Sequence, residues 1–483
     1  MVLVFDIGTS ALKGGIINRK GELLEKAEVP LCLMEGSHPL HHEADTRSWI
    51  SSLIEVSGTL SVSGKRAVEA VVVSGNGPTL VPVGDDGEPL DYAMTWMDRR
   101  GVEEAGIIAE ATGDYVDPTF FLPKAFWVFR NKPEVYEKAR YFFGCPEFLD
   151  YYLTGNACTI FPSDQFARYI WTEDIIRELG MAPQKFPPFI KPGQGLGKVR
   201  SEAGKVLGIP SKTPVFAGGP DFIMTLLGTA TVAPGRACDR AGTSEGINLC
   251  SRTPLEDRRL MCLPHIIEGF HNISGIISTS GKALEWYKDI SGRGELGYES
   301  MLGEAGGVPA GSRGLIFLPY LAGERAPLWD PYARGSFIGL TAKHGSNEIT
   351  RAVIESIGYA IRDVIEVMEE NGLIIEELRV TGGQAKSPLW NQVKADITGK
   401  KILVADVKDS ELIGDACVGL YALGEYDSLA DASERIVKIE TEYSPQKSVR
   451  KLYDELFSLY RSSYKGLKDI FRRLASLASE EEP

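Results

Sequence analysis

Apolar and polar residues alternate in blocks at the start of the chain, in a pattern that predicts two short strands joined by a tight turn. Val2–Phe5 and Gly14–Ile17 are apolar, and the residues between them are mostly small or polar. Asp45–Leu60 instead carries apolar side chains at helical spacing, which predicts a helix. Further segments of predicted strand occupy 22–29, 67–74 and 80–83. The pattern therefore predicts a strand-rich start interrupted by one helix.

The predicted turn carries residues suited to phosphate. Gly8 has no side chain, so a ligand can approach its backbone closely. Backbone amides and the hydroxyls of Thr9 and Ser10 can face phosphate oxygens, and Lys13 can add a positive charge. Asp6 can hold Mg²⁺, usually through water. An ordinary β-hairpin with a polar turn explains the same residues about as well.

A second stretch repeats this pattern. Ala237–Cys250 has an Asp, then the triplet Gly242, Thr243 and Ser244, and then an apolar exit. The two triplets begin at 8 and 242, so 234 residues separate them, close to half of the 483 residues. We therefore expect an α/β protein of two similar domains, 1–236 and 237–483, each presenting a turn to one phosphate chain.

Two further glycine pairs stand at the ends of predicted strands. Gly218-Gly219 leads through Pro220 and Asp221 into the apolar FIMTLLG, so Asp221 is expected near a helix N-terminus, where an N-cap role without chemistry is one interpretation. Gly382-Gly383 lies within RVTGGQAKSPLW and precedes a predicted helix. Alone, such a turn before a helix is weak support for a nucleotide site.

Helical spacing returns in three segments of the second half. The segment 348–370 is amphipathic, and 412–423 contains small residues that suit close packing. The segment 447–478 carries an apolar stripe, which we interpret as a packing face on the first domain or against a second subunit. The second interpretation would make the protein a homodimer.

Taken in order, these motifs resemble the FGGY carbohydrate kinases of the sugar-kinase/actin/heat-shock-ATPase superfamily, and xylulose kinases in particular. The two polar turns are similar to the phosphate-binding hairpins of that superfamily. Trp96-Met97-Asp98-Arg99-Arg100 matches the WxDxR substrate motif, although alone it suits an exposed helix start, and 315–341 is similar to the second-domain signature. The resemblance extends from residue 2 to about residue 470. It implies two ribonuclease H-like α/β domains with the active site in the cleft between them.

The resemblance also implies roles for individual residues. Asp221 would be the general base that takes a proton from a terminal hydroxyl of the sugar. Asp6 would hold Mg²⁺. The sugar would bind near Asn76, Gly77, Trp96, Asp98, Arg100 and Asp221. ATP would bind near Thr9, Ser10, Lys13, Gly242, Thr243, Gly382, Gly383, Gln384, Ser387 and Asn391.

Two departures from the family pattern leave the substrate open. Xylulose kinases usually carry Gln-Met-His-Gly where this chain has Asn76-Gly77-Pro78, and glycerol kinases carry Gln-Arg-Glu. Most relatives have a third glycine where Gln384 stands. The implied substrate is a ketose such as xylulose, or a related polyol or sugar acid.

Composition and net charge limit the kinds of partner that the protein is expected to bind. The chain is 43% hydrophobic and 24% charged, as in an ordinary globular protein, and its net charge is −14. An acidic surface argues against nucleic acid or an anionic membrane as the main partner. Without a signal peptide or an apolar run of about 18 residues, we expect a cytoplasmic protein.

Two other classes of function are open to this sequence. GTSEG at 242–246 also matches the GxSxG nucleophile elbow of hydrolases, but that motif needs a helix after the serine, and strand-like residues follow here. An ATPase or nucleotide-dependent interaction protein without a sugar would share the superfamily fold. The WxDxR segment favours the sugar kinase.

Overall fold

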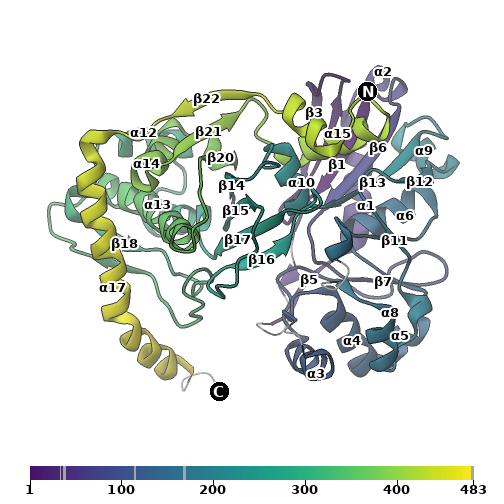
Figure 1. Cartoon of the computed structure of the whole chain (residues 1–483), viewed down its shortest axis with the longest axis horizontal. Coiled ribbons are helices and arrows are strands. Elements are labelled where there is room, and N and C mark those ends of the chain that lie inside the picture. The colour runs from purple at the N-terminus through teal and green to yellow at the C-terminus, as the bar shows by residue number, and fades with distance from the viewer. Residues whose placement is uncertain (33, 36–37, 39, 114–115, 167–169, 480–483) are drawn as a thin grey trace. The chain divides into compact units, whose positions relative to one another are not determined.

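A computed structural model describes residues 1–32, 34–35, 38, 40–113, 116–166 and 170–479. The backbone divides into two compact units (Figure 1). Unit 1 comprises Met1–Ala230, Pro264–Glu268 and Asp409–Val437. Unit 2 comprises Thr231–Leu263, Gly269–Lys408 and the residues from Lys438 onward.

This division differs from the predicted domains, 1–236 and 237–483, chiefly in one segment. Asp409–Val437 lies far into the second half of the sequence but packs within unit 1. The packing depends on small residues, because a Cβ added to Gly414 would lie 2.0 Å from the carbonyl oxygen of Met224. The sequence showed that a helix with small residues packs closely, but not against which unit.

Unit 1 is built on a six-stranded mixed sheet in the order β12-β13-β6-β1-β2-β3. β1 pairs antiparallel with β2 and parallel with β6, and β13 is parallel to β6. The elements of this unit are β1 (Val2–Ile7), β2 (Ala11–Ile17), β3 (Leu23–Pro30), β4 (Met34–Glu35), β5 (His42–Ala44), α1 (Thr46–Thr59), α2 (Val62–Arg66), β6 (Ala70–Gly75), β7 (Val81–Val83), β8 (Ala93–Met94), α3 (Val102–Thr112), α4 (Phe121–Asn131), α5 (Pro133–Lys138), β9 (Tyr141–Phe143), α6 (Cys145–Thr154), β10 (Thr159–Ile160), η1 (Asp164–Phe166), α8 (Glu173–Glu178), η2 (Pro183–Lys185), β11 (Phe189–Ile190), β12 (Gly195–Lys198), α9 (Ser201–Leu207), β13 (Pro214–Pro220), α10 (Asp221–Gly228), α15 (Ser410–Ala422) and α16 (Leu429–Ile436).

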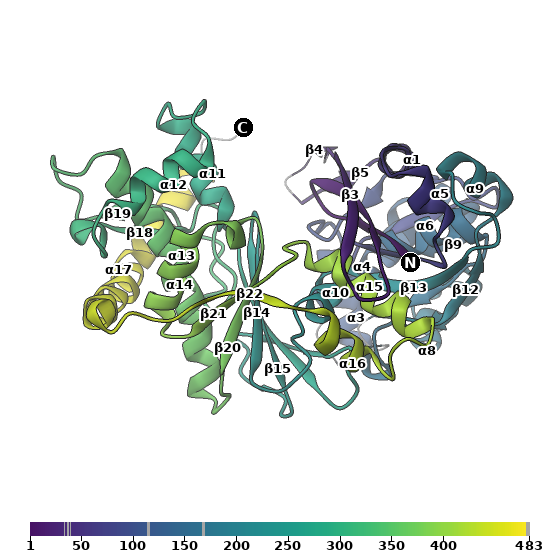
Figure 2. The same ribbon diagram turned by 90° about the horizontal axis from the view of Figure 1, so that it is seen from above.

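Helices cover both faces of this sheet. α1 packs on β2 and β3, and α6 packs on β6 and β13. α15 packs on β1, β6 and β13 and against α10, and Figure 2 shows α15 on the other side of the sheet from α1 and α6. Because both faces are covered, β1 and β6 are buried along their whole length. The ends of β1, β6 and β13 and the starts of α10 and α15 supply the functional residues described below.

Unit 2 is built on a seven-stranded sheet in the order β16-β17-β15-β14-β20-β21-β22. Its elements are β14 (Arg236–Ala241), β15 (Glu245–Ser251), β16 (Met261–Pro264), β17 (His271–Ile277), α11 (Gly281–Ile290), α12 (Tyr298–Gly306), η3 (Ser312–Gly314), β18 (Ile316–Leu318), β19 (Ser336–Ile338), α13 (Ser346–Glu370), β20 (Glu377–Gly382), η4 (Gln384–Lys386), α14 (Pro388–Thr398), β21 (Lys401–Ala405), β22 (Ile439–Tyr443) and α17 (Lys447–Ser479).

The sequence echo corresponds to a repeated topology. In unit 1, β1 pairs antiparallel with β2 and parallel with β6. In unit 2, β14 pairs antiparallel with β15 and parallel with β20. Each unit therefore places the turn of a β-hairpin beside the end of a parallel strand. The repeat in the sequence predicted this similarity between the two units.

The long C-terminal helix differs from the prediction in its partner. The stripe on α17 packs within unit 2, where Tyr453, Leu456, Tyr460, Tyr464 and Phe471 join the core that includes α13. Tyr460 and Tyr320 also share a buried hydrogen bond of 2.6 Å between their hydroxyls. Most of the stripe is therefore buried inside its own unit, but Leu452 and Leu474 are exposed. The homodimer stays a prediction.

Candidate active site

The turn between β1 and β2 has the predicted form. The amide of Gly8 donates to the carbonyl of Ala11 at 2.9 Å, Thr9 is half-buried and Ser10 is exposed. The indole Nε1 of Trp96 donates to Thr9 Oγ1 at 2.9 Å. The turn and the WxDxR segment, 87 residues apart in sequence, are therefore adjacent in unit 1.

Asp6 lies one residue before the end of β1, near other carboxylates. Its side chain is buried and accepts a hydrogen bond of 2.9 Å from Ser74 Oγ. Burial raises the pKa of Asp6 from 3.8 to about 7, and the nearby carboxylates of Glu411 and Asp221 raise it further than Lys13 and Ser74 lower it. A cation at this position would stabilise the ionised carboxylates.

Lys13, on β2, provides a positive charge beside this acidic group. Its Nζ lies 2.9 Å from Asp409 Oδ1, at the residue before α15. Burial disfavours the ammonium charge, but the carboxylates of Glu411, Asp409 and Asp6 together raise the pKa of Lys13 above its ordinary value. Lys13 is therefore charged at neutral pH and can also attract a phosphate.

The residues around Asp6 fit a magnesium ion that keeps most of its water. Carboxylate oxygens are the ligands that Mg²⁺ prefers, and in kinase sites one or two of them usually suffice beside substrate phosphates. Among the described residues, no three His, Cys, Asp or Glu side chains are grouped so that they can hold one metal ion without other ligands. Asp6 is thus suited to share a hydrated ion with a nucleotide.

Asp221 is the first residue of α10, as predicted. Its Oδ1 accepts a hydrogen bond of 2.6 Å from the amide of Phe222, and its side chain is buried. Thr225, one turn later, donates to Glu411 Oε1 at 3.2 Å and so connects α10 to α15. A Cβ added to Gly77 would lie 3.4 Å from Pro220, so the loop at 76–78 runs beside the start of α10.

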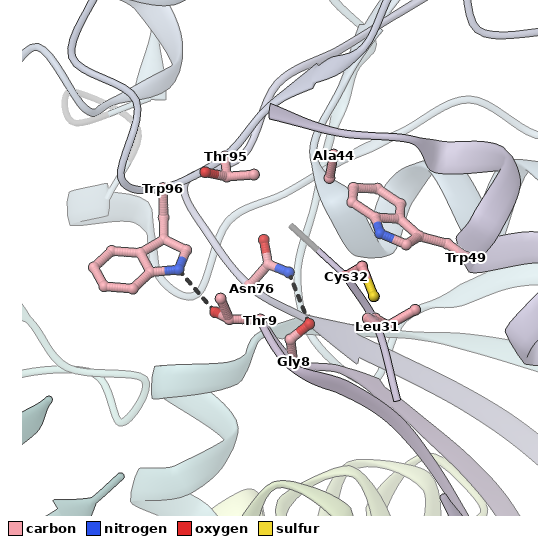
Figure 3. A pocket seen from close by; sticks show the side chains of 9 residues that line it. All are labelled: Gly8, Thr9, Leu31, Cys32, Ala44, Trp49, Asn76, Thr95 and Trp96. Atoms are coloured by element: carbon pink, nitrogen blue, oxygen red, sulfur yellow. Dashed lines mark hydrogen bonds between the residues drawn. The ribbon is translucent and has the colours of Figure 1, made fainter. Parts of the chain in front are cut away.

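A small pocket lies beside the first turn (Figure 3). Figure 3 shows Trp96 hydrogen-bonded to Thr9 on one side, with Trp49 and Cys32 on the opposite side. The described residues that line it include no charged side chain. They are Gly8, Thr9, Leu31, Cys32, Ala44, Trp49, Asn76, Thr95 and Trp96.

The polar side-chain atoms of Asn76 are hydrogen-bonded within the protein. Its Nδ2 lies 3.1 Å from the carbonyl of Ile7 and 3.3 Å from that of Gly8, and its Oδ1 accepts from Thr79 Oγ1 at 2.5 Å. The amide therefore holds the end of β1 and the first turn in place. The predicted contact between Asn76 and a sugar stays a prediction.

Asp98 and Arg100, both predicted to bind sugar, bind each other. Arg100 Nη2 lies 2.7 Å from Asp98 Oδ2 and 2.6 Å from Glu43 Oε1. Asp98 is fully buried and also accepts from the amide of His42 at 2.8 Å. The guanidinium of Arg100 lies 5.0 Å from the ring centre of Trp127. These contacts brace β5 against the WxDxR segment, so direct contact with sugar hydroxyls stays a prediction.

Lys124, on α4, is a positioning residue in the same region. Its fully buried Nζ donates to the carbonyl of Pro78 at 2.8 Å and to that of Thr95 at 2.6 Å. Burial lowers the pKa of Lys124 to about 7, so the amine can be neutral there. It joins the 76–78 loop to the residue before Trp96.

Unit 2 holds the second predicted turn, at Gly242–Ser244. Gly242 and Thr243 are exposed, and their carbonyls accept from the amides of Gly281 and Ser280, each at 3.0 Å. The carbonyl of Ala241 crowds the end of β20, where an added Cβ on Gly382 would lie 2.3 Å from it. The positive φ of 82° at Gly382 also favours glycine.

The residues that follow Gly382 divide into exposed and buried ones. Gly383 is exposed with open space around it, and Ser387 caps α14 by accepting from the amide of Trp390 at 3.3 Å. Asn391 is fully buried and donates to the carbonyl of Ala385 at 2.9 Å. Its side chain therefore shapes this loop from within, and its contact with a nucleotide stays a prediction.

A buried polar group underlies the second turn. Lys394, on α14, donates to Asp239 Oδ2 and Glu245 Oε1, each at 2.5 Å, and all three side chains are buried. Glu245 Oε2 accepts from Ser280 Oγ and, at 3.1 Å, from Gln384 Nε2. Gln384 Nε2 also lies 2.6 Å from Ser280 Oγ. This group, Asp239, Glu245, Ser280, Gln384 and Lys394, is called the unit 2 polar cluster below.

Comparison with known proteins assigns the family. A model of the N-terminal domain of the FGGY family of carbohydrate kinases matches residues 1–228, and one of the C-terminal domain matches residues 240–423. A xylulose kinase from Staphylococcus epidermidis is 30% identical over 498 aligned residues, which cover 99% of each protein. The chain belongs to the FGGY family of carbohydrate kinases.

Other FGGY relatives confirm the fold and vary in substrate. A gluconokinase from Bacillus licheniformis is 25% identical over 98% of each protein. Crystal structures of a xylulose kinase and a gluconate kinase from Lactobacillus acidophilus each match with a TM-score of 0.85 at 25% identity. These two alignments cover 98% of this chain and 100% and 99% of the respective structures. The predicted two-domain kinase fold is confirmed, and the protein is an enzyme that phosphorylates a small sugar with ATP as co-substrate.

The other function classes considered from sequence are not favoured. In this FGGY kinase Ser244 precedes strand β15 instead of a helix, which excludes a nucleophile elbow. Full-length similarity to sugar kinases disfavours an ATPase without a sugar. In the part of the chain that the structure describes, no helix has the length and apolar character needed to cross a bilayer.

Sequence reasoning missed several residues of the site. Asp409 and Glu411 form an acidic pair at the start of the helix 410–422. The sequence contains this pair, but its role becomes clear only once α15 is known to lie beside Lys13. Asp415 Oδ2 likewise lies 2.7 Å from Ser74 Oγ, within hydrogen-bond distance. Lys394 lies among the buried residues of α14, where a lysine is unusual unless it is paired with an acidic residue.

Removing the cation of the unit 2 polar cluster should destabilise the protein strongly. We expect Lys394→Met to lower the free energy of unfolding by about 3 kcal/mol, because Asp239 and Glu245 would be left buried without their cation. Urea unfolding of the ligand-free protein measures this. Lys386→Met, at an exposed lysine of the same unit, is the control and should change the free energy by less than about 0.5 kcal/mol. Equal stability of the two variants would contradict the prediction.

Proposed function

We propose that this FGGY kinase transfers the γ-phosphoryl group of Mg·ATP to a terminal hydroxyl of a neutral ketose, with Asp221 as the general base. The observation that carries the proposal is the group of charged residues beside the first turn of unit 1. Asp6 has Glu411, Asp221 and Lys13 as charged neighbours, and Lys13 also pairs with Asp409 at 2.9 Å. Phosphoryl transfer needs alignment and charge neutralisation more than covalent chemistry. These residues supply both.

Each residue has a separate task in this mechanism. Asp221 accepts the hydroxyl proton as the oxygen attacks phosphorus, and the hydrogen bond from Phe222 holds its carboxylate in place. Asp6 would hold Mg²⁺, which, when bound, neutralises charge on the phosphates. The amides and hydroxyls of Thr9 and Ser10, and the charge of Lys13, bind phosphate oxygens. In unit 2, Gly242 and Thr243 bind phosphate, and Gly382, Gly383 and Ser387 form the adenosine side.

We place a neutral sugar beside the first turn because the small pocket there has no charged side chain in its described lining. Its described lining includes Thr9, Thr95, Asn76 and two indoles, and it carries no cation to pair with a carboxylate. The arginine that completes the WxDxR motif, Arg100, is already paired with Asp98 and Glu43. Among the substrates named for relatives, xylulose therefore suits this site better than gluconate. Since ATP is the co-substrate, we place the reaction in the cytoplasm.

A substrate panel tests this proposal. ADP release is measured with Mg·ATP and D-xylulose, L-xylulose, D-ribulose, L-ribulose, glycerol or gluconate at equal concentrations. We expect one ketose to raise the rate above the sugar-free rate by about 100-fold or more, and gluconate to raise it by less than a tenth of that. Gluconate as the best acceptor would overturn the neutral-sugar assignment. A sugar-free rate that no compound raises would contradict the proposed acceptors altogether.

A further inference from the structure

Gln384 follows the glycine pair at the end of β20, and its side chain turns into unit 2. Gln384 is buried, and its Nε2 lies 3.1 Å from Glu245 Oε2 and 2.6 Å from Ser280 Oγ. Both partners adjoin the other loop of the proposed nucleotide site. Glu245 directly follows the turn Gly242–Ser244, and the amide of Ser280 donates to the carbonyl of Thr243 at 3.0 Å.

Glu245, a hydrogen-bond partner of Gln384, is itself held in place by other side chains of unit 2. Glu245 is fixed by Lys394, which comes from α14, the helix that begins just after the Gln384 loop. Glu245 is thus held from α14, from Gln384 and from Ser280 at once. Lys394 and its partners are buried, so water does not compete for these hydrogen bonds. A glycine at position 384 would remove the side-chain hydrogen bonds to Glu245 and Ser280.

We propose that Gln384 is a positioning residue that locks the loop after β20 to the turn between β14 and β15, so that both loops are arranged before the nucleotide binds. This inference rests on the proposed assignment of ATP to these two loops. Gln384 itself does not contact the nucleotide, because its amide nitrogen is engaged inside unit 2. We expect Gln384 to affect nucleotide affinity, because a ligand that spans two loops already held in place does not bear the entropy cost of ordering them.

The test is nucleotide binding without turnover. Isothermal titration calorimetry measures ADP binding, and competition against ADP measures adenosine binding, for the full-length wild type and for Gln384→Met, which keeps the side-chain length and removes the hydrogen bonds. We expect Gln384→Met to weaken ADP binding by about tenfold and adenosine binding by less than about threefold, because only ADP spans both loops. In turnover assays the KM for ATP should rise while kcat at saturating ATP stays within about threefold.

Gln392→Met is the matched control. Gln392 lies eight residues later and also donates two hydrogen bonds, to Asp396 Oδ1 at 2.8 Å and to the carbonyl of Ser444 at 3.0 Å, but neither partner belongs to the two loops. This variant should bind ADP like the wild type. Ser280→Ala gives a second route if Gln384→Met folds poorly: it should also weaken ADP binding, and the double variant should lose less than the product of the two single losses.

The outcomes separate this inference from the proposed function. Unchanged ADP affinity in Gln384→Met, or equal losses for ADP and adenosine, would overturn the locking role while the kinase assignment stands. Equal losses in Gln384→Met and Gln392→Met would overturn it as well. If the wild type phosphorylates sugar but substitutions at Gly242 and Gly383 leave ADP binding unchanged, the assignment of these loops to the nucleotide would instead be overturned.

Discussion

Replacing Asp221 with Asn is expected to lower kcat by about 10²–10⁴-fold, while the KM values for sugar and ATP stay within a few-fold. Asparagine has nearly the same shape as aspartate, so its side-chain oxygen can still accept the hydrogen bond of 2.6 Å from the amide of Phe222. It cannot take the proton of the sugar hydroxyl. Steady-state kinetics with the best ketose from the substrate panel would measure the loss.

The control for this variant is Asp174→Asn, in the first turn of α8. Asp174 is an exposed aspartate at a similar position in a helix of the same unit, and its replacement should leave kcat within about twofold. Sugar binding to Asp221→Asn, measured by calorimetry, shows whether the pocket is intact. A variant that binds sugar normally and keeps more than about a fifth of the wild-type kcat would contradict the assignment of Asp221 as base.

Local pattern predicted the parts of the fold that local pattern determines. The turns at 8–10 and 242–244, the helix start at Asp221 and the helices α1, α13 and α17 follow from apolar spacing and from turn residues over short windows. The cap of α1 is an example, since Asp45 accepts from the amide of Arg47 as expected of an N-cap. Such features depend on residues a few positions apart, so one sequence contains what is needed to find them.

Long-range packing could not be predicted in the same way. The helix α15 crosses back to unit 1, and only there do Asp409 and Glu411 meet Lys13 and Asp6. Nothing in the apolar pattern of 410–422 distinguishes one sheet from another as its partner. The side of the site formed by α15 was therefore absent from the sequence-based prediction.

Side-chain direction was the second missing quantity. Asn76, Asp98 and Gln384 were all predicted as ligand contacts because their motifs resemble ligand-binding motifs of FGGY carbohydrate kinases. In the structure their polar atoms bind Gly8, Arg100 and Glu245. A buried polar group must be hydrogen-bonded, and in a crowded loop the nearest partner is often another part of the chain. A motif locates such residues near a site without deciding whether they face the ligand or support those that do.

Asp6→Asn is expected to abolish most activity and, at the same time, to stabilise the ligand-free protein. With its anionic ligand to Mg²⁺ removed, kcat/KM should fall by about 100-fold or more. The stability gain follows from the pKa of Asp6, which burial and the nearby Glu411 and Asp221 raise from 3.8 to about 7. A neutral asparagine avoids the cost of ionising that buried carboxyl, so the free energy of unfolding at pH 8 should rise by roughly 1 to 3 kcal/mol.

The pH dependence gives the sign of this effect. Between pH 4 and 7 the folded protein keeps the proton of Asp6 while the unfolded chain has lost it, so the contribution of Asp6 to stability falls as pH rises. Asparagine does not titrate. The stability advantage of Asp6→Asn in urea unfolding should therefore be small near pH 4, grow up to about pH 7 and stay constant above it, whereas Asp174→Asn should show no such trend. An Asp6→Asn protein that is less stable than the wild type at pH 8 would show that Asp6 is held ionised by its surroundings, and that the acidic group beside Lys13 does not require a cation.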